Sequence, residues 1–106
     1  MKVRIEEESI RFRITAEERE QLNGGHQVTM HAPLSAEHPL EICLCVHKGV
    51  HDISCGFNGS SICVELGQHT LEALNEAPEK GIQRDFPAEQ PMIRILVEQD
   101  RPLRHK

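Results

Sequence analysis

The sequence predicts an α+β fold: a curled or barrel-like antiparallel sheet of six to seven strands, accompanied by two short helices. Several segments alternate apolar and polar residues with the period of two that marks half-buried strands. Only two stretches combine helix start and stop signals. Most connections are too short for the helical crossovers that join parallel strands. At 106 residues, we expect a single domain over residues 1–106.

The chain begins with two predicted strands, residues 3–5 and 10–14, joined by a turn over 6–9. Both strands alternate apolar and charged residues, so each has one face for the core and one for solvent. Pairing Ile5 with Ile10 makes the apolar face of the hairpin continuous. A shift of one residue would turn that face outward, so the sequence nearly dictates this register.

A short helix is predicted directly after the hairpin. Thr15 and Glu18 have the spacing of a capping box, in which the side chain of each residue accepts a hydrogen bond from the backbone N–H of the other. Gly24-Gly25 ends the helix. Leu22 is its only large apolar residue, so we expect the helix to be mostly exposed.

The remaining elements are assigned by the same patterns. Asn58-Gly59 is the strongest hairpin signal and predicts that Phe57 pairs with Ser60. No internal repeat is apparent in this order of elements. We expect further strands over residues 26–30, 40–47, 53–57, 60–66 and 92–98, a short strand within 81–86, a second helix over 68–77 and a frayed tail over 101–106.

The charge balance argues against nucleic acids and membranes as partners. Lys and Arg number 12 against 17 Asp and Glu, which gives a formal net charge of −5. Binding to polyanionic surfaces needs net or clustered positive charge. The N-terminal segment lacks the apolar stretch of a secretory signal, so we expect a cytoplasmic protein. In a reducing cytosol the four cysteines are expected to be free thiols.

One face of the first hairpin is predicted to be cationic. The apolar register places Arg4 opposite Arg11. It also places Lys2 opposite Arg13, and Arg94 joins them if the last strand pairs with this hairpin. Like charges directly opposite each other destabilise a sheet by some tenths of a kcal/mol per pair, so a compensating group is expected. That group is either an anionic ligand, since Arg binds phosphate and carboxylate in bidentate fashion, or a set of surface ion pairs.

A second candidate site contains thiols. Cys43, Cys45 and His47 are predicted to share one face of a strand, because residues two apart point the same way. Two thiolates and an imidazole suit zinc or copper(I). The predicted hairpin places Cys63 two strands away, about 9.5 Å off, which leaves it out of the site. The alternative is that the cysteines only pack in the interior or at a dimer contact, as Cys55 is expected to do in the core.

The opening MKVRIEEESIRFRITAEEREQL resembles the start of a family of small, uncharacterised bacterial proteins. Members begin with MK(I/V)RI and continue to SIR(F/L)R. The likeness extends through ISCGFNGSSICVEL and MIRILVEQD. The resemblance implies a cytoplasmic bacterial protein and offers no known activity, cofactor or catalytic residue.

The function expected from the sequence is that of a small cytoplasmic accessory or binding domain without a resident cofactor. It would bind a small anion or a partner protein through the cationic hairpin face, defined as Lys2, Arg4, Arg11 and Arg13. The alternative is a soft-metal protein that holds zinc or copper. No catalytic constellation is recognised, which favours a non-enzymatic role without deciding it. An exposed strand edge leaves a homodimer open.

Overall fold

The computed structural model describes residues 1–33, 37, 39–87 and 93–100. The predicted tail over 101–106 and the first residue of the strand predicted over 92–98 lie outside these ranges. Within them, eight strands and two helices are present, so the expectation of six to seven strands is wrong. The elements are β1 (Lys2–Ile5), β2 (Ser9–Ile14), α1 (Ala16–Asn23), β3 (Val28–Ala32), β4 (Leu40–Val46), β5 (Ile53–Phe57), β6 (Ser61–Leu66), α2 (Gln68–Glu76), β7 (Ile82–Phe86) and β8 (Ile93–Gln99).

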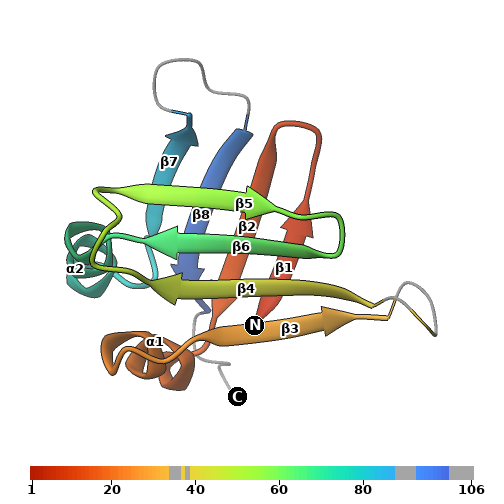
Figure 1. The fold of residues 1–106 in the computed structure, drawn as a ribbon. Helices are drawn as coiled ribbons and strands as arrows, with labels where there is room; N and C mark the ends of the chain where they lie inside the picture. Colours follow the sequence, from red (N-terminus) through yellow and green to blue (C-terminus); the bar gives the residue numbers. More distant parts are fainter. Residues whose placement is uncertain (34–36, 38, 88–92, 101–106) are drawn as a thin grey trace, which may run out of the picture.

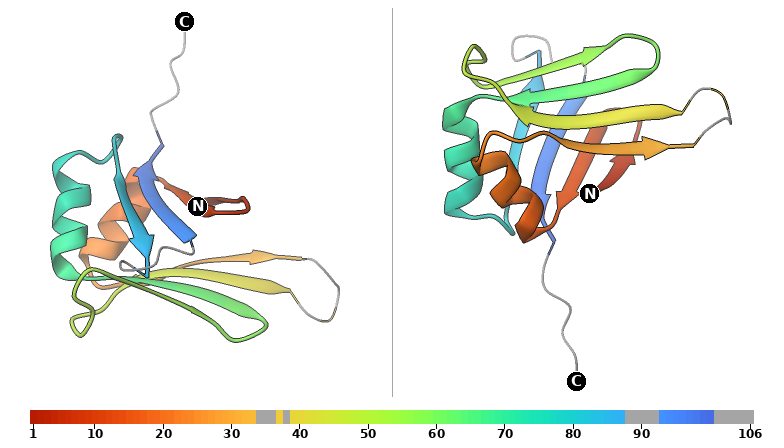
Figure 2. Two further views of the ribbon diagram at one scale, coloured as in Figure 1. Left: turned by 90° about the horizontal axis from the view of Figure 1, so that it is seen from above. Right: turned by 60° about the horizontal axis from the view of Figure 1, so that its bottom comes forward.

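The strands form two four-stranded sheets rather than one curled or barrel-like sheet. Sheet A has the order β1-β2-β8-β7 and sheet B the order β3-β4-β6-β5. The strands of one sheet run across those of the other, and both helices lie at the same end (Figure 1, Figure 2). The α+β class is confirmed, but the all-antiparallel arrangement is wrong. At the centre of each sheet one pair is parallel, β2 with β8 and β4 with β6.

Each parallel pair joins two hairpins that are distant in the chain. β1–β2 and β7–β8 are antiparallel hairpins, and they meet through β2 and β8. Sheet B is built in the same way from the hairpins β3–β4 and β5–β6. Short connections exclude a parallel pair between consecutive strands, but not between strands of different hairpins. The sequence-based reasoning considered only consecutive strands and therefore missed both pairs.

The fold contains an internal repeat that the sequence analysis did not detect. The order β1-β2-α1-β3-β4 is repeated as β5-β6-α2-β7-β8, and the repeat exchanges the two sheets. Ile10 and Ile62 lie in equivalent places on β2 and β6, 52 positions apart, and Leu22 and Leu74 are related by the same spacing. Few residues are identical between the halves, which explains why composition and motifs did not show the duplication.

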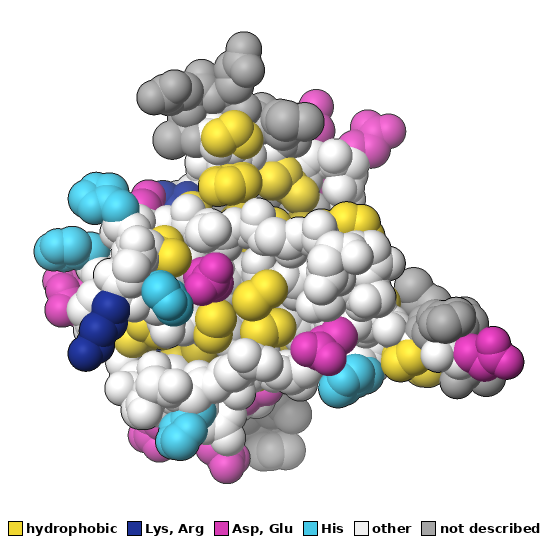
Figure 3. Space-filling model, viewed as in Figure 1, with side chains coloured by type: hydrophobic (Ala, Val, Ile, Leu, Met, Phe, Trp, Pro, Cys, Tyr) yellow, Lys and Arg dark blue, Asp and Glu magenta, His cyan; other side chains and the backbone are white. Residues whose placement is uncertain are grey.

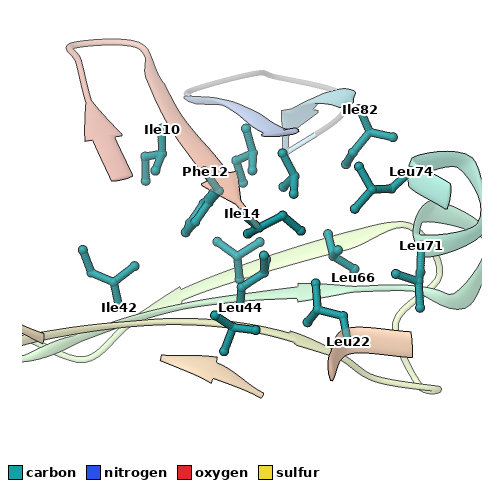
Figure 4. Close-up of a cluster of buried hydrophobic side chains, with 14 residues drawn as sticks. Ile10, Phe12, Ile14, Leu22, Ile42, Leu44, Leu66, Leu71, Leu74 and Ile82 are labelled. Atoms are coloured by element: carbon teal, nitrogen blue, oxygen red, sulfur yellow. The ribbon is translucent and has the colours of Figure 1, made fainter. Parts of the chain in front are cut away.

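The core lies between the two sheets and is closed at one end by the helices. Ile10, Phe12 and Ile14 of β2 point from sheet A toward Leu44 and Leu66 of sheet B (Figure 4). Phe12, Ile14, Leu44 and Leu66 are completely shielded from solvent. Leu22 of α1 and the leucines of α2, Leu71 and Leu74, cap this end of the core. No helix in the described ranges is long and apolar enough to cross a membrane.

Two local predictions are confirmed, and a third, the pairing within the hairpin at Asn58-Gly59, is wrong. In the first hairpin, Ile5 pairs with Ile10 as expected. Thr15 and Glu18 form the capping box of α1. In the hairpin β5–β6, Phe57 pairs with Ile62 across a four-residue loop and not with Ser60 as predicted, a shift of two residues. A shift of two keeps every side chain on its predicted face.

Candidate functional site

The outward faces of the two sheets carry opposite chemistry. The outward face of sheet A includes the cationic hairpin face. The outward face of sheet B carries three cysteines at its centre, on β4 and β6. Figure 3 looks onto sheet B and shows a group of yellow side chains, the colour shared by apolar residues and cysteine, over the middle of this face. The two candidate sites predicted from the sequence therefore lie on opposite sides of the molecule.

Cys43, Cys45 and Cys63 form what we term the thiol cluster. Their sulfur atoms all lie within 4.8 Å of one another. Cys43 and Cys63 are directly opposite in the parallel pair, and the Cys63 Sγ–H donates to the Cys43 Sγ over 3.4 Å. Cys45 follows two residues along on the same face. All three are free thiols.

The prediction that Cys63 lies two strands from Cys43 is wrong. It assumed that β5 lies between β4 and β6, whereas β6 pairs directly with β4 and β5 forms the edge of the sheet. The sequences of β4 and β5 are consistent with a central and an edge position, respectively. β4 is a nearly continuous apolar run, which is typical of a strand buried in the middle of a sheet. β5 contains Gly56, which weakens a strand and suits an edge position.

His47 does not belong to the thiol cluster. β4 ends at Val46, and the chain turns immediately afterwards. The Nδ1 atom of His47 accepts a hydrogen bond from the backbone N–H of Gly49 over 3.0 Å. Alternation alone predicted that His47 would continue the row of Cys43 and Cys45. The structure instead brings Cys63 to these two cysteines, from a strand that sequence spacing could not connect to them.

Burial controls the ionisation of the thiols. Cys43 is 3% exposed although it lies on an outward face. Burial, followed by the adjacent thiols of Cys63 and Cys45, raises the pKa of Cys43. Burial, followed by Cys63 and the carboxylate of Glu65, raises the pKa of Cys45 to about 11. Both thiols are therefore protonated at neutral pH, and a metal ion would have to displace their protons.

The surroundings of the thiol cluster offer negative rather than positive charge. Glu65 is the Cα partner of Cys45 across the parallel pair. Farther along the same face, His31 contacts Glu41 with an N–O distance of 3.4 Å. In the described part of sheet B, the outward positions of the four strands contain no Lys or Arg. Figure 3 likewise shows no dark blue side chain over the centre of this face.

The structure reproduces the predicted register of the cationic hairpin face. Arg4 lies opposite Arg11, and Lys2 lies opposite Arg13. Arg94 lies beside Ser9 on β8, so it extends the same outward face. The four hairpin cations line a small cavity of about 160 Å³.

Carboxylates accompany every cation of this region. The closest pairs are Arg4–Glu6 at 2.9 Å, Arg94–Asp85 at 3.0 Å, Arg13–Glu98 at 3.1 Å, Arg11–Glu98 at 3.6 Å and Lys2–Asp100 at 3.6 Å. Glu98 thus forms ion pairs with two arginines, Arg11 and Arg13. These ion pairs offset the like-charge repulsion that the sequence predicted. Most of the side chains are well exposed, where such pairs contribute about 0–1 kcal/mol each.

Comparison with protein families decides where the chain belongs. A family of unknown function, DUF7009, matches residues 1–102. The chain is a member of this family. Membership of DUF7009 agrees with the expected likeness to an uncharacterised family, while the bacterial origin stays a prediction. DUF7009 carries no assigned activity, so function has to be inferred from the geometry. Comparison with curated proteins gave no match.

Proposed function

We propose that this member of DUF7009 binds a single thiophilic metal ion through Cys43, Cys45 and Cys63. The convergence of three sulfur atoms within 4.8 Å carries the proposal. Thiolate ligands select soft ions such as copper(I), and zinc as a borderline case. Two of the ligands come from β4 and the third from β6, so the ligand set is complete only in the folded sheet.

The position of the thiol cluster suits a preorganised site. β4 and β6 are the two central strands of sheet B, each paired on both sides. Ligands on such strands move less than ligands on loops, so less ordering is needed when the ion binds. Three protein ligands also match copper(I) in trigonal coordination. Zinc would need a fourth ligand, such as water, because it is normally four-coordinate.

We place the protein in the cytoplasm as part of this proposal. All four cysteines are free thiols, and thiols persist in a reducing compartment. The described residues contain no disulfide that would indicate an oxidising one.

The test is a titration of the reduced protein with copper(I), read by native mass spectrometry. The wild type should bind one copper and lose reactivity at three thiols. Cys63→Ser should lose the copper or bind it much more weakly. Cys55→Ser is the matched control, because Cys55 faces the core and lies outside the thiol cluster. Equal copper binding by Cys63→Ser and the wild type would refute the proposal.

A second candidate is anion binding at the cationic hairpin face. Its support is the cavity lined by four cations. Among the described residues, these cations pair with the carboxylates of Glu6, Glu98 and Asp100, which leaves one positive charge in excess. Inorganic phosphate should then raise the melting temperature of the wild type but not of Arg4→Gln/Arg11→Gln. Lys48→Gln, on the turn after β4, serves as the control. An unchanged melting temperature of the wild type would dismiss this candidate.

A further inference from the structure

We infer that the thiol cluster accepts a trivalent thiophilic ion, of which arsenic(III) is the simplest probe, as a neutral three-thiolate complex. The inference rests on the proposed function and names the ligand class of the same site. It follows from two features of the structure: the absence of a compensating cation around the thiol cluster in the described residues, and the number of ligands that the cluster supplies.

Comparison of the two halves of the internal repeat shows that sheet A has an arginine where sheet B has a glutamate next to the thiol cluster. The rung of sheet B that holds Cys45 and Glu65 corresponds to the rung of sheet A that holds Glu98 and Arg13. In sheet A an arginine balances the carboxylate over 3.1 Å. In sheet B the equivalent position carries Glu65, which adds a negative charge beside the thiols. The two halves have the same arrangement of strands, but the charge at the equivalent position is positive for Arg13 and negative for Glu65.

The charge of the bound complex then distinguishes the ions. Three thiolates with copper(I) carry two negative charges, and with zinc they carry one. A trivalent ion leaves the complex neutral. A net negative charge at a buried site is unfavourable unless a cation or hydrogen-bond donors compensate it. Cys43 is almost fully buried and Glu65 is close by, so the neutral complex suits this face best.

The ligand number points the same way. The cluster supplies three sulfur atoms, and the imidazole of His47, which the sequence analysis expected as a ligand beside Cys43 and Cys45, accepts a hydrogen bond from the backbone of Gly49 instead. Arsenic(III) uses three ligands and keeps a lone pair in the remaining direction. Arsenous acid would react as As(OH)₃ with three thiols to give As(SR)₃ and three water molecules. Three As–O bonds break and three As–S bonds form, each thiol proton leaves in a water molecule, and no oxidation state changes.

The experiment measures loading of the reduced protein with sodium arsenite at neutral pH. Native mass spectrometry should show one arsenic gained and three hydrogens lost in the wild type and in Cys55→Ser. Cys63→Ser should not form this three-thiolate species. Glu65→Gln tests the charge argument, since it keeps the side-chain shape. It should strengthen zinc binding several-fold and change the arsenic affinity less than about twofold.

The outcomes separate this inference from the proposed function. Arsenic loading that consumes all three thiols supports this inference, and copper(I) bound through the same thiols supports the proposed function. If copper(I) binds through the thiol cluster but the same protein forms no arsenic adduct, the inference of a trivalent ligand is wrong and the proposed metal-binding function stands. If neither ion binds, both proposals fail. Arsenic binding that gains several-fold in Glu65→Gln would contradict the neutral complex. Circular dichroism of each variant confirms that the sheets are intact.

Discussion

Cys43 and Cys63 lie side by side on β4 and β6, with 3.4 Å between their sulfur atoms, although they belong to different hairpins. The contact depends on the parallel pair at the centre of sheet B. Any change that separates the two hairpins would therefore dismantle the thiol cluster. This relationship links the long-range topology of the fold directly to the proposed function.

The thiol cluster should react slowly with alkylating reagents. Only the thiolate is a nucleophile, and the pKa of Cys45 is raised from 9.0 to about 11. At pH 8 its thiolate fraction should be roughly 100-fold smaller than that of an ordinary thiol. Iodoacetamide labelling followed by peptide mass spectrometry would measure this. Labelling of Cys45 at the same rate in the folded and the urea-unfolded protein would contradict the burial argument.

Stability should fall as the pH rises above 9. The unfolded thiol of Cys45 ionises near pH 9, whereas the folded thiol stays protonated until about pH 11. The unfolded state is therefore favoured progressively between these values. The groups that face Cys45 are the thiols of Cys43 and Cys63 and the carboxylate of Glu65. Urea denaturation from pH 8 to pH 10.5 should show a smaller decrease in the midpoint for Cys45→Ala than for the wild type.

Asp52 should contribute stability that is lost in acid. Partial burial raises its pKa, but hydrogen bonds from Thr70 and Arg84 outweigh this, so the pKa lies below 3.8. The Arg84 Nε donates to both carboxylate oxygens over 3.1 Å and so connects β7 to the segment before β5. The contribution is present above pH 4 and decreases as the pH falls through the folded pKa.

The size of the Asp52 effect should be modest, because the carboxylate is about half exposed. Asp52→Asn should cost less than about 1 kcal/mol at pH 7 and a smaller amount at pH 2.5. Urea denaturation at the two pH values gives the difference. A cost that is equal at both would show that the charge of Asp52 does not matter.

The interface between the two halves should depend on a pair of equivalent amides. Asn23 ends α1, and Asn75 lies 52 positions later on α2. Each side-chain amide donates to the other, over 3.0 Å and 2.6 Å, and Arg19 also donates to Asn75. Asn75→Ala should reduce the free energy of unfolding by about 1–2 kcal/mol. Asn58→Ala, in the loop before β6, is not a suitable control because Asn58 accepts two backbone hydrogen bonds.

A better control for Asn75→Ala is Glu72→Ala on the same helix. Glu72 is exposed, and its described partner is His69 at 3.8 Å, so the loss should be a few tenths of a kcal/mol. If the two variants unfold at the same denaturant concentration, the paired amides do not stabilise the contact between the helices.

The sequence predicts local structure well because its signals are local. The register of the first hairpin follows from alternation on each side of a short turn, and the structure pairs Ile5 with Ile10 as expected. The capping box of Thr15 and Glu18 spans four residues and is also correct. The predicted face of Cys55 holds as well, since it packs against the core.

The arrangement of the hairpins could not be predicted in the same way. Whether β5 or β6 pairs with β4 depends on contacts between segments that alternation does not relate. One signal was available in the sequence: residues 42–46 are consecutively apolar, ICLCV, where a half-exposed strand would alternate. That run indicates a central strand with a neighbour on each side. Without the parallel pair, Cys63 could not be placed next to Cys43.

The most direct test of the metal site is X-ray absorption spectroscopy of the copper(I)-loaded protein. It counts the sulfur atoms bound to the ion and is independent of how tightly the ion binds. We predict three sulfur ligands in the wild type and in Cys55→Ser, and a loss of one in Cys63→Ser. A spectrum with one sulfur ligand or none, or an identical spectrum for Cys63→Ser, would contradict a site built from Cys43, Cys45 and Cys63.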